Sequence, residues 1–249
     1  MLSLTIELGS VMDIQVFIFN WRNQFDKTVE KERALSSLGY RVTVINSDEE
    51  NEQVHWINLG ESAYFTDQFM KALELFDGDV MFHVQGDASY DDWNHLIKDA
   101  KESFDTYRWG IYAPNVDYTW YNKERTDIQG IQLRDKTMKV VACPDCTCWF
   151  IHKDIIDVFK QLKIDMSPYK MGWGWDIILP GISFLMRRLV IRDYHHTIDH
   201  PPGTNYNKNQ AEVEMQQLFN VLPNELKVMF NWIKGDRQQI LQLFQEVEQ

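Results

Sequence analysis

The chain has 249 residues, a formal charge of -12 at pH 7 and 44% hydrophobic residues. That length can bury a substantial core, as one large domain or two small ones. An acidic chain without a cluster of Lys and Arg is poorly suited to a nucleic-acid backbone, so we expect no nucleic-acid partner. The first eighteen residues have neither a basic start nor an apolar run that could span a bilayer, which favours a cytoplasmic protein.

Strand and helix patterns alternate along the N-terminal half. Short β-rich apolar runs are followed by charged stretches or by apolar residues at helical spacing, such as Phe65, Phe69 and Leu73. The expected elements are strands at 14–19, 41–45 and 79–84, with helices up to Leu38, over 62–76 and from Asp91 onward. The first three form a β-α-β unit, which predicts a parallel pair of strands.

The second half is more mixed. The patterns predict strands at 109–113, 139–142, 147–151 and 189–192 and helices at 154–162 and 176–188. The last strand leads into a polar segment at 193–207, and most of the final forty residues are helical, with breaks at 220–223 and Gly235. The chain is therefore expected to be an α/β protein.

Three polar residues follow predicted strands, at the places where ligands collect beside an open α/β sheet. They are Asn20, Asp48 and Asp87. Such residues also cap helices or form turns, so the coincidence of three favours a binding site more than any one of them does. A carboxylate at a rigid strand end, as at Asp87, suits a hard divalent cation that can bridge the phosphates of a nucleotide diphosphate.

The strand at 80–84 with Gln85, Gly86 and Asp87 resembles the Asp-x-Asp region of glycosyltransferases with the GT-A fold. The resemblance extends from Ile14 to about Tyr206. It implies a GT-A-like, mixed but mainly parallel central sheet flanked by helices, in a single domain over 1–249. It also implies that 1–105 bind a nucleotide sugar, with UDP-sugar (UDP, uridine diphosphate) as first choice. Residues 106–206 would then recognise a carbohydrate or other hydroxyl acceptor, and 207–249 would form a helical tail.

The same resemblance assigns roles to residues at the strand ends. Asn20 and Asp48 would hold the nucleoside, and Asp87 would hold Mn²⁺ or Mg²⁺. The chain departs from the family at Gln85, where the first Asp usually stands, so the metal would lose one anionic ligand. Gln85 can still hydrogen-bond to ribose or to a coordinated water, and Gly86 lets the backbone approach a ligand closely.

A second motif, Met171-Gly172-Trp173-Gly174-Trp175-Asp176, is similar to the Trp-Gly-rich acceptor segment of many GT-A enzymes. Indole faces stack on sugar rings, and a carboxylate can deprotonate an acceptor hydroxyl. Trp173, Gly174, Trp175 and Asp176 are therefore expected to bind the acceptor, with Asp176 as the catalytic base. Asp176 is also placed to cap the following helix.

Three histidines, at 195, 196 and 200, follow the last predicted strand. GT-A enzymes often bring a C-terminal histidine back to the metal, and the resemblance implies His200 for this role, with His196 as the second choice. Trp120 and Tyr121, in a polar loop after Asn115, are further candidates for closing over a substrate.

The three cysteines lie at 143, 146 and 148, with His152 close by. They cannot form a disulfide framework. Their residue types suggest zinc, but Cys146 and Cys148 would project from one face of a strand too close together for the usual turn-held pair. Three functions stay open: a metal-assisted glycosyltransferase, a catalytically weak nucleotide-binding protein with the same fold, and a zinc-stabilised interaction module.

Overall fold

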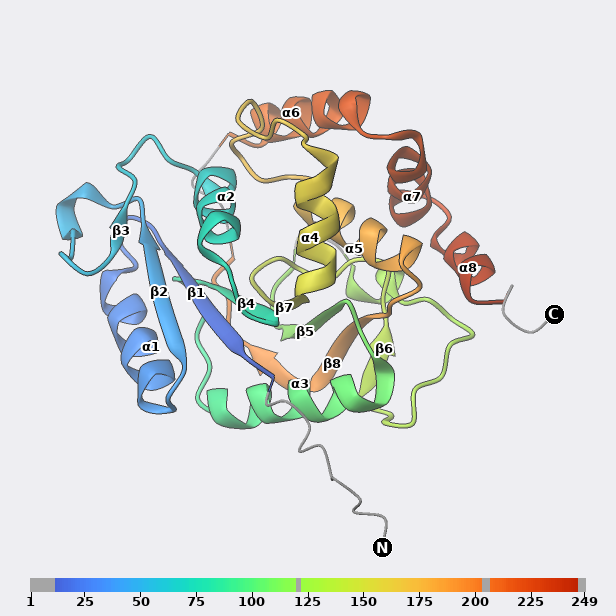
Figure 1. Cartoon of the computed structure of the whole chain (residues 1–249), viewed down its shortest axis with the longest axis horizontal. Helices are drawn as coiled ribbons and strands as arrows, with labels where there is room; N and C mark the ends of the chain where they lie inside the picture. Colours follow the sequence, from blue (N-terminus) through green and yellow to red (C-terminus); the bar gives the residue numbers. More distant parts are fainter. Residues whose placement is uncertain (1–11, 120–121, 203–206, 246–249) are drawn as a thin grey trace, which may run out of the picture.

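A single sheet runs through the molecule in the order β3-β2-β1-β4-β7-β5-β8-β6 (Figure 1). The structure is a computed structural model that describes residues 12–119, 122–202 and 207–245. Its strands are β1 (Ile14–Asn20), β2 (Arg41–Asn46), β3 (Ile57–Asn58), β4 (Val80–Gln85), β5 (Ile111–Val116), β6 (Met138–Val140), β7 (Cys148–His152) and β8 (Val190–Ile198).

The strand directions bring several strand ends to one edge of the sheet. Strands β1, β2, β3 and β4 are parallel to one another, and β7 pairs antiparallel with both β4 and β5. Strand β8 is parallel to β5, and β6 is antiparallel to β8. The carboxyl ends of β1, β2, β4, β5 and β8 and the start of β7 therefore lie at the same edge.

Helices cover both faces of the sheet (Figure 1). They are α1 (Phe25–Ser37), α2 (Phe65–Leu75), α3 (Trp93–Tyr107), α4 (Lys153–Leu162), α5 (Trp175–Leu185), α6 (Lys208–Val221), α7 (Asn224–Lys234) and α8 (Gln242–Gln245). Helices α1 and α3 share one hydrophobic core with the sheet. Helices α2, α4 and α5 share the other, to which α6 and α7 add their apolar faces.

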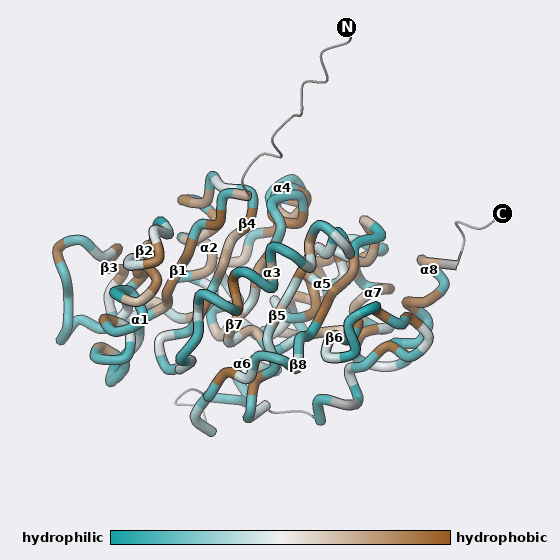
Figure 2. The backbone as a smooth tube through the Cα atoms, turned by 90° about the horizontal axis from the view of Figure 1, so that it is seen from below, coloured by the Kyte–Doolittle hydropathy of each residue, from teal (hydrophilic) through white to brown (hydrophobic). Residues whose placement is uncertain are grey.

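The hydrophobic pattern explains these layers. Every residue of β1 is buried, which is what a strand covered on both faces by helices requires. In Figure 2 the hydrophobic colour is strong along β1. Helix α2 turns its Phe65, Phe69 and Leu73 stripe into the core. Asp92 is the N-cap of α3, and its side chain accepts a hydrogen bond from the His95 N–H.

The predicted α/β fold class is confirmed, and most predicted elements are present within two or three residues of their expected limits. The prediction for the last strand was wrong at its end. Strand β8 continues to Ile198, through a segment expected to be a loop. Its polar residues can lie in a strand because several are buried and hydrogen-bonded. For example, the Tyr112 hydroxyl donates a hydrogen bond to Asp193. The two-residue strand β3 had no recognisable pattern.

The cysteine prediction also needs correction. Cys148 is buried in the core on the α1 and α3 side, whereas Cys146 packs against the core on the other side. Strand β7 begins only at Cys148, because Asp145 accepts hydrogen bonds from the Thr147 N–H and hydroxyl and holds a turn before it. In the described part of the chain, no helix combines the length and the apolar character needed to cross a membrane.

Candidate active site

A cleft of about 1450 Å³ opens at the edge where the parallel strands end. Its walls come from the loops after β1, β2, β4 and β8, from the turn before β7, from the Trp-Gly loop before α5, and from α6 and α7. Six of the predicted site residues line it: Gln85, Asp87, Trp173, Gly174, Asp176 and His200. Segments far apart in the sequence thus converge on one hollow.

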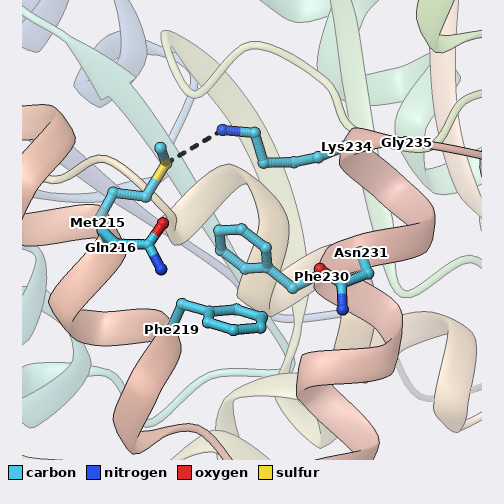
Figure 3. A pocket seen from close by; sticks show the side chains of 7 residues that line it. All are labelled: Met215, Gln216, Phe219, Phe230, Asn231, Lys234 and Gly235. Atoms are coloured by element: carbon cyan, nitrogen blue, oxygen red, sulfur yellow. Dashed lines mark hydrogen bonds between the residues drawn. The ribbon is translucent and has the colours of Figure 1, made fainter.

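A smaller hollow of about 390 Å³ lies between α6 and α7 (Figure 3). Phe219 and Phe230 line it, and Lys234 Nζ donates to Met215 Sδ at 3.7 Å across its rim. It shares Met215, Lys234 and Gly235 with the large cleft. Its lining contains neither a carboxylate nor an imidazole, so the chemistry belongs to the large cleft.

Asp87 and His200 meet in the cleft although 113 positions separate them in the sequence. Ser89 and Asp199 form an antiparallel bridge, with N–H to carbonyl distances of 2.9 and 3.0 Å. This bridge places the loop after β4 beside the end of β8. As a result, His200 Nε2 lies 3.6 Å from Asp87 Oδ2. The His200 backbone N–H also donates to Asp117 Oδ1, at the end of β5.

The Asp87–His200 pair has the properties of an incomplete cation site. Asp87 Oδ1 and His200 Nδ1 are both buried and have no hydrogen-bond partner among the described atoms. Buried polar atoms are nearly always satisfied, so two unsatisfied atoms in one site call for an explanation. The other two atoms of the pair, Asp87 Oδ2 and His200 Nε2, face each other at 3.6 Å, which is too long for a hydrogen bond and short enough for two ligands of one ion. The residues fit Mn²⁺ or Mg²⁺, which commonly take one or two carboxylates and complete their shells with phosphates and water.

Gln85 and Gly86 support this loop in different ways. The Gln85 amide Nε2 donates to Cys146 Sγ at 3.9 Å and lies in the cleft. A side chain at Gly86 would meet Phe19 O and Thr28 Oγ1 at 2.8 Å, so the glycine is needed for packing on β1 and α1. The Gly86 carbonyl accepts a hydrogen bond from Lys31 Nζ at 3.0 Å. Burial lowers the pKa of Lys31 to about 8, with the Asp87 charge opposing this shift.

Asn20 and Asp48 lie at the predicted strand ends, but both are buried. Asn20 Nδ2 donates to Asn46 Oδ1, and Asn20 Oδ1 accepts from the Thr28 hydroxyl, each at 2.7 Å. Asp48 accepts from the Glu50 N–H and from the Asn51 amide. These bonds tie β1, β2 and the next loop together. Neither residue lines the cleft, and a nucleoside could reach their polar atoms only by displacing these bonds.

The residues next to them do line the cleft, and sequence reasoning missed them. Trp21 follows Asn20, and Ser47 precedes Asp48. Trp21 stacks on Phe65 with ring centroids 6.4 Å apart, and Arg22 pairs with Glu50 beside it. The sequence pattern located the two strand ends that border the cleft. It does not show which of two adjacent residues at a strand end faces the cleft, because that depends on the backbone geometry.

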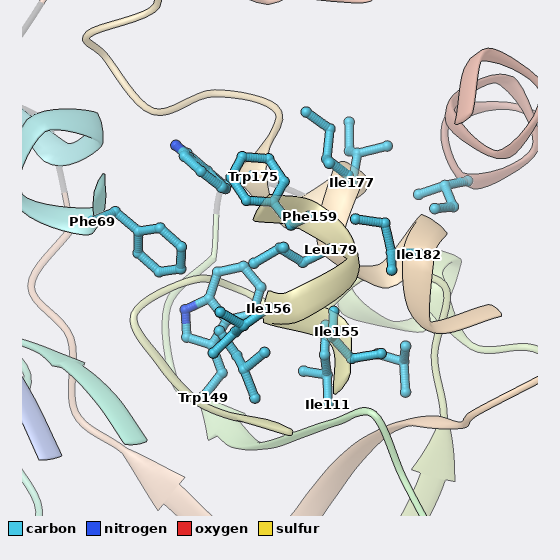
Figure 4. Close-up of a cluster of buried hydrophobic side chains, with 14 of the residues drawn as sticks. Phe69, Ile111, Trp149, Ile155, Ile156, Phe159, Trp175, Ile177, Leu179 and Ile182 are labelled. Carbon is cyan, nitrogen blue, oxygen red and sulfur yellow. The ribbon is translucent and has the colours of Figure 1, made fainter. Parts of the chain in front are cut away.

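The Trp-Gly loop enters the cleft through only part of its predicted set. Gly172 and Gly174 have φ values of +86° and +108°, and a side chain at Gly172 would meet the Phe65 ring at 2.5 Å. Trp173 lines the cleft. Trp175, expected at the acceptor, is fully buried instead (Figure 4). Its ring lies 4.5 Å from Phe69, and its Nε1 donates to Thr66 Oγ1.

Asp176 combines a place in the cleft with an unusual charge environment. It is the first-turn acid of α5, and its Oδ1 accepts from the Gly174 N–H at 3.3 Å. Burial, followed by the charge of Asp145, which also lines the cleft, raises the pKa of Asp176 to about 6. A carboxyl that titrates near neutrality can take a proton from a hydroxyl and release it again.

Cys143 and Cys146 also line the cleft. Burial is the main cause that raises the pKa of each thiol, to about 12 at Cys143. Thiols that stay protonated are weak nucleophiles and weak metal ligands. Among the residues with described positions, the groups of three or more close metal-ligating side chains include no cysteine. Trp120 and Tyr121 lie outside the described residues.

No protein-family model and no curated protein sequence matches the chain. Solved structures do. GalNAc-T7, solved with UDP, GalNAc and Mn²⁺, gives a TM-score of 0.58 at 9% identity over 94% of this chain and 54% of its own. S. aureus TarS 1-349, in complex with UDP-GlcNAc, gives 0.57 at 10% identity over 95% of this chain and 73% of its own. Both are GT-A glycosyltransferases.

The chain has the GT-A fold. It spans about half the length of the GalNAc-T7 chain. At such low identity the likeness establishes the arrangement of the backbone, and the chemistry must be argued from the cleft itself.

Proposed function

We propose that the chain is a glycosyltransferase that moves a sugar from a nucleotide diphosphate, with UDP-sugar as first choice, to a hydroxyl acceptor. The observation that carries this proposal is the approach of Asp87 Oδ2 and His200 Nε2 to 3.6 Å at the strand-end edge of the cleft, where the other polar atom of each side chain is buried without a described partner. That GalNAc-T7 was solved with UDP and Mn²⁺ and TarS with UDP-GlcNAc supports the choice of donor.

The residues divide into a donor end and an acceptor end. At the donor end, Asp87 and His200 would hold Mn²⁺ or Mg²⁺, which would neutralise negative charge on the diphosphate leaving group. Trp21 and Ser47 face the nucleoside, while Asn20 and Asp48 position these strand ends from behind. We assign this end to 1–105 together with His200, and acceptor recognition to the rest of 106–206 with help from 207–249.

At the acceptor end, Trp173 offers an aromatic face for a sugar ring, and Asp176 accepts the proton of the attacking hydroxyl. The half-buried carboxyl is ionised above its raised pKa of about 6, so it can act as a base at neutral pH. A base at this position favours transfer with inversion of the sugar configuration.

The test is calorimetric titration with UDP, with and without Mn²⁺, on the native chain and on Asp87→Ala. We expect Mn²⁺-dependent binding that weakens by about tenfold or more in the variant. Asp91→Ala is the matched control, because Asp91 is an exposed carboxylate four residues along the same loop. If no nucleotide binds under either condition, the donor site is excluded. If Mn²⁺-dependent binding survives Asp87→Ala, the metal is held elsewhere.

A second candidate is a binding protein with the same fold and little transfer activity. Gln85 favours it, since the site then has one carboxylate, and among described residues the close groups of three metal-ligating side chains do not include Asp87. Hydrolysis of a panel of nucleotide sugars separates the two. Turnover lost in Asp176→Asn, with UDP binding kept, indicates an enzyme, and binding without turnover indicates the alternative.

A further inference from the structure

A second group of metal-ligating side chains lies on the α3 side of the sheet and does not line the cleft. His95 and Asp99 are one turn apart on α3, and His195 belongs to β8. His195 Nδ1 lies 3.3 Å from Asp99 Oδ2, and His95 Nε2 lies 3.5 Å from Asp99 Oδ1. One ligand atom from each of the three residues lies within 4.8 Å of the others.

An irregularity in β8 creates this group. Pro114 of β5 pairs with Asp193, but the next residue, Asn115, pairs with Thr197. Three residues of β8, 194–196, are therefore extra to the ladder. Consecutive side chains of a regular strand point to opposite faces. Here His195 and His196 both reach Asp99, as expected where a bulge redirects side chains.

His196 has a different role from the two outer histidines. It is 1% exposed, and its Nε2 lies 3.0 Å from Asp99 Oδ2. The Tyr90 hydroxyl lies 2.7 Å from its Nδ1. The consistent arrangement has the Tyr90 hydroxyl donating to Nδ1 and Nε2–H donating to Asp99. Hydrogen bonds of this kind orient the ligands of protein metal sites. His95 and His195 instead have side chains 42% and 52% exposed, open to an ion from solvent.

We propose that His95, Asp99 and His195 bind Zn²⁺, with a water in the fourth position. Zinc takes N and O ligands at about 2.0–2.2 Å in tetrahedral geometry, which places ligand atoms about 3.4 Å apart. His195 Nδ1 lies 3.3 Å from Asp99 Oδ2 and His95 Nε2 lies 3.5 Å from the other oxygen, Asp99 Oδ1, so each imidazole nitrogen is at ligand spacing from one oxygen of this carboxylate. Two imidazoles and one carboxylate select zinc over Mg²⁺ or Ca²⁺, which prefer oxygen ligands.

The position of this site gives the cation a structural role. It would join α3 to β8 close to the Ser89–Asp199 bridge that holds Asp87 beside His200. Tyr90, which fixes His196, directly follows Ser89 in that bridge. Bound Zn²⁺ would therefore brace the two segments that form the donor end of the cleft, and it should raise the melting temperature by mass action.

Isothermal titration calorimetry tests the proposal. ZnCl₂ is titrated into untagged, EDTA-dialysed full-length protein. We expect one Zn²⁺ per chain, with affinity reduced by about tenfold or more in His95→Gln, in His195→Gln and in the double variant. His55→Gln is the matched control, since His55 is an exposed histidine 3.1 Å from a carboxylate of Glu32. It should bind as the native chain does. Circular dichroism checks that each variant is folded.

Two further variants separate this site from its rivals. Zinc uptake should persist in Asp87→Ala/His200→Ala and in Cys143→Ser/Cys146→Ser. Co²⁺ bound in place of zinc should give the intense visible bands of four-coordinate cobalt. Three results would each overturn the proposal: no stoichiometric zinc on the native chain, equal affinity in the His95→Gln/His195→Gln variant, or zinc lost with the cleft or cysteine variants.

Discussion

The environment that raises the pKa of Asp176 suits it to act as a base, but the same environment destabilises the folded chain. Its pKa is about 6 in the folded chain against an ordinary value of 3.8. Between these values the folded state keeps the proton that the unfolded chain has lost, so stability falls as pH rises from about 4 to 6. The cost persists at neutral pH and amounts to about 1–3 kcal/mol. Such a cost is typical of a group selected for function.

We therefore expect Asp176→Asn to raise the melting temperature at pH 7 and to leave it nearly unchanged at pH 4. The asparagine oxygen can still accept from the Gly174 N–H. Transfer activity should fall by about 10²–10⁴-fold, because the base is lost. Thermal melts at both pH values, with Asp91→Asn as the exposed control, measure the first effect. An equal shift at both pH values would contradict the burial argument.

Gln85 offers a gain-of-function prediction at the same scale. Its side chain lies in the cleft beside Asp87. Gln85→Asp adds a second anionic ligand and should lower the Mn²⁺ concentration for half-maximal UDP binding by about tenfold, since affinity follows ligand charge. Gln85→Asn is the matched control, because it has the length of the aspartate without its charge. A similar gain in Gln85→Asn would show that length, and not charge, limits the site.

At the scale of elements, the sequence predicted where the strands end. It did not show which residues from distant segments lie beside those ends. The alternating pattern located β1, β2 and β4 and hence the edge with the cleft. The Asp87–His200 pairing was implied by a family resemblance, and the Ser89–Asp199 bridge that creates it is invisible in the sequence. Trp175 was expected to bind the acceptor and is buried instead, because the motif does not show which of its two tryptophans packs in the core.

Helix α6 supports the Trp-Gly loop through a long-range contact that no sequence pattern indicated. Glu214 is buried, and its Oε2 accepts from the Met171 N–H at 2.8 Å. Gln210 donates to its other oxygen. Because an unpartnered buried donor is costly, Glu214 fixes the entry of the loop that carries Trp173 and Asp176.

Glu214→Ala should lower the free energy of unfolding by about 1–3 kcal/mol, because the Met171 N–H loses its acceptor. Glu214→Gln should cost much less, since its amide oxygen can still accept that bond. Chemical denaturation measures both variants. We also expect a higher KM for the acceptor in Glu214→Ala, with UDP binding unchanged. If both variants behave alike, the charge matters more than the hydrogen bond.

At the scale of the whole molecule, the cleft is assembled from all parts of the chain. The donor end comes from the loops after β1, β2, β4 and β8, the acceptor end from the Trp-Gly loop, and one wall from α6 and α7. The layers depend on hydrophobic periodicity, which many sequences satisfy. The same backbone arrangement therefore exists at 9% and 10% identity, while no family model matches the sequence.

Apolar residues of the C-terminal helices are part of the hydrophobic core. Leu226, Met229, Phe230 and Ile233 of α7 are buried in the core that includes α5. A side chain at Gly181 of α5 would lie 3.2 Å from Met229 Cβ, so the two helices are in close contact. Each buried apolar side chain stabilises the fold by about 1.5–3 kcal/mol.

We therefore expect a chain that lacks 207–249 to aggregate or to lose cooperative unfolding. Met229→Ala tests the same contact with a single substitution and should lower the free energy of unfolding by about 2–5 kcal/mol. Val228→Ala is its control, since the neighbouring Val228 is 44% exposed and should change stability by less than about 0.5 kcal/mol. Thermal and denaturant unfolding measure both variants. A truncated chain that unfolds cooperatively and still binds UDP would show that α6 and α7 only flank the cleft, because the core would then be complete without them.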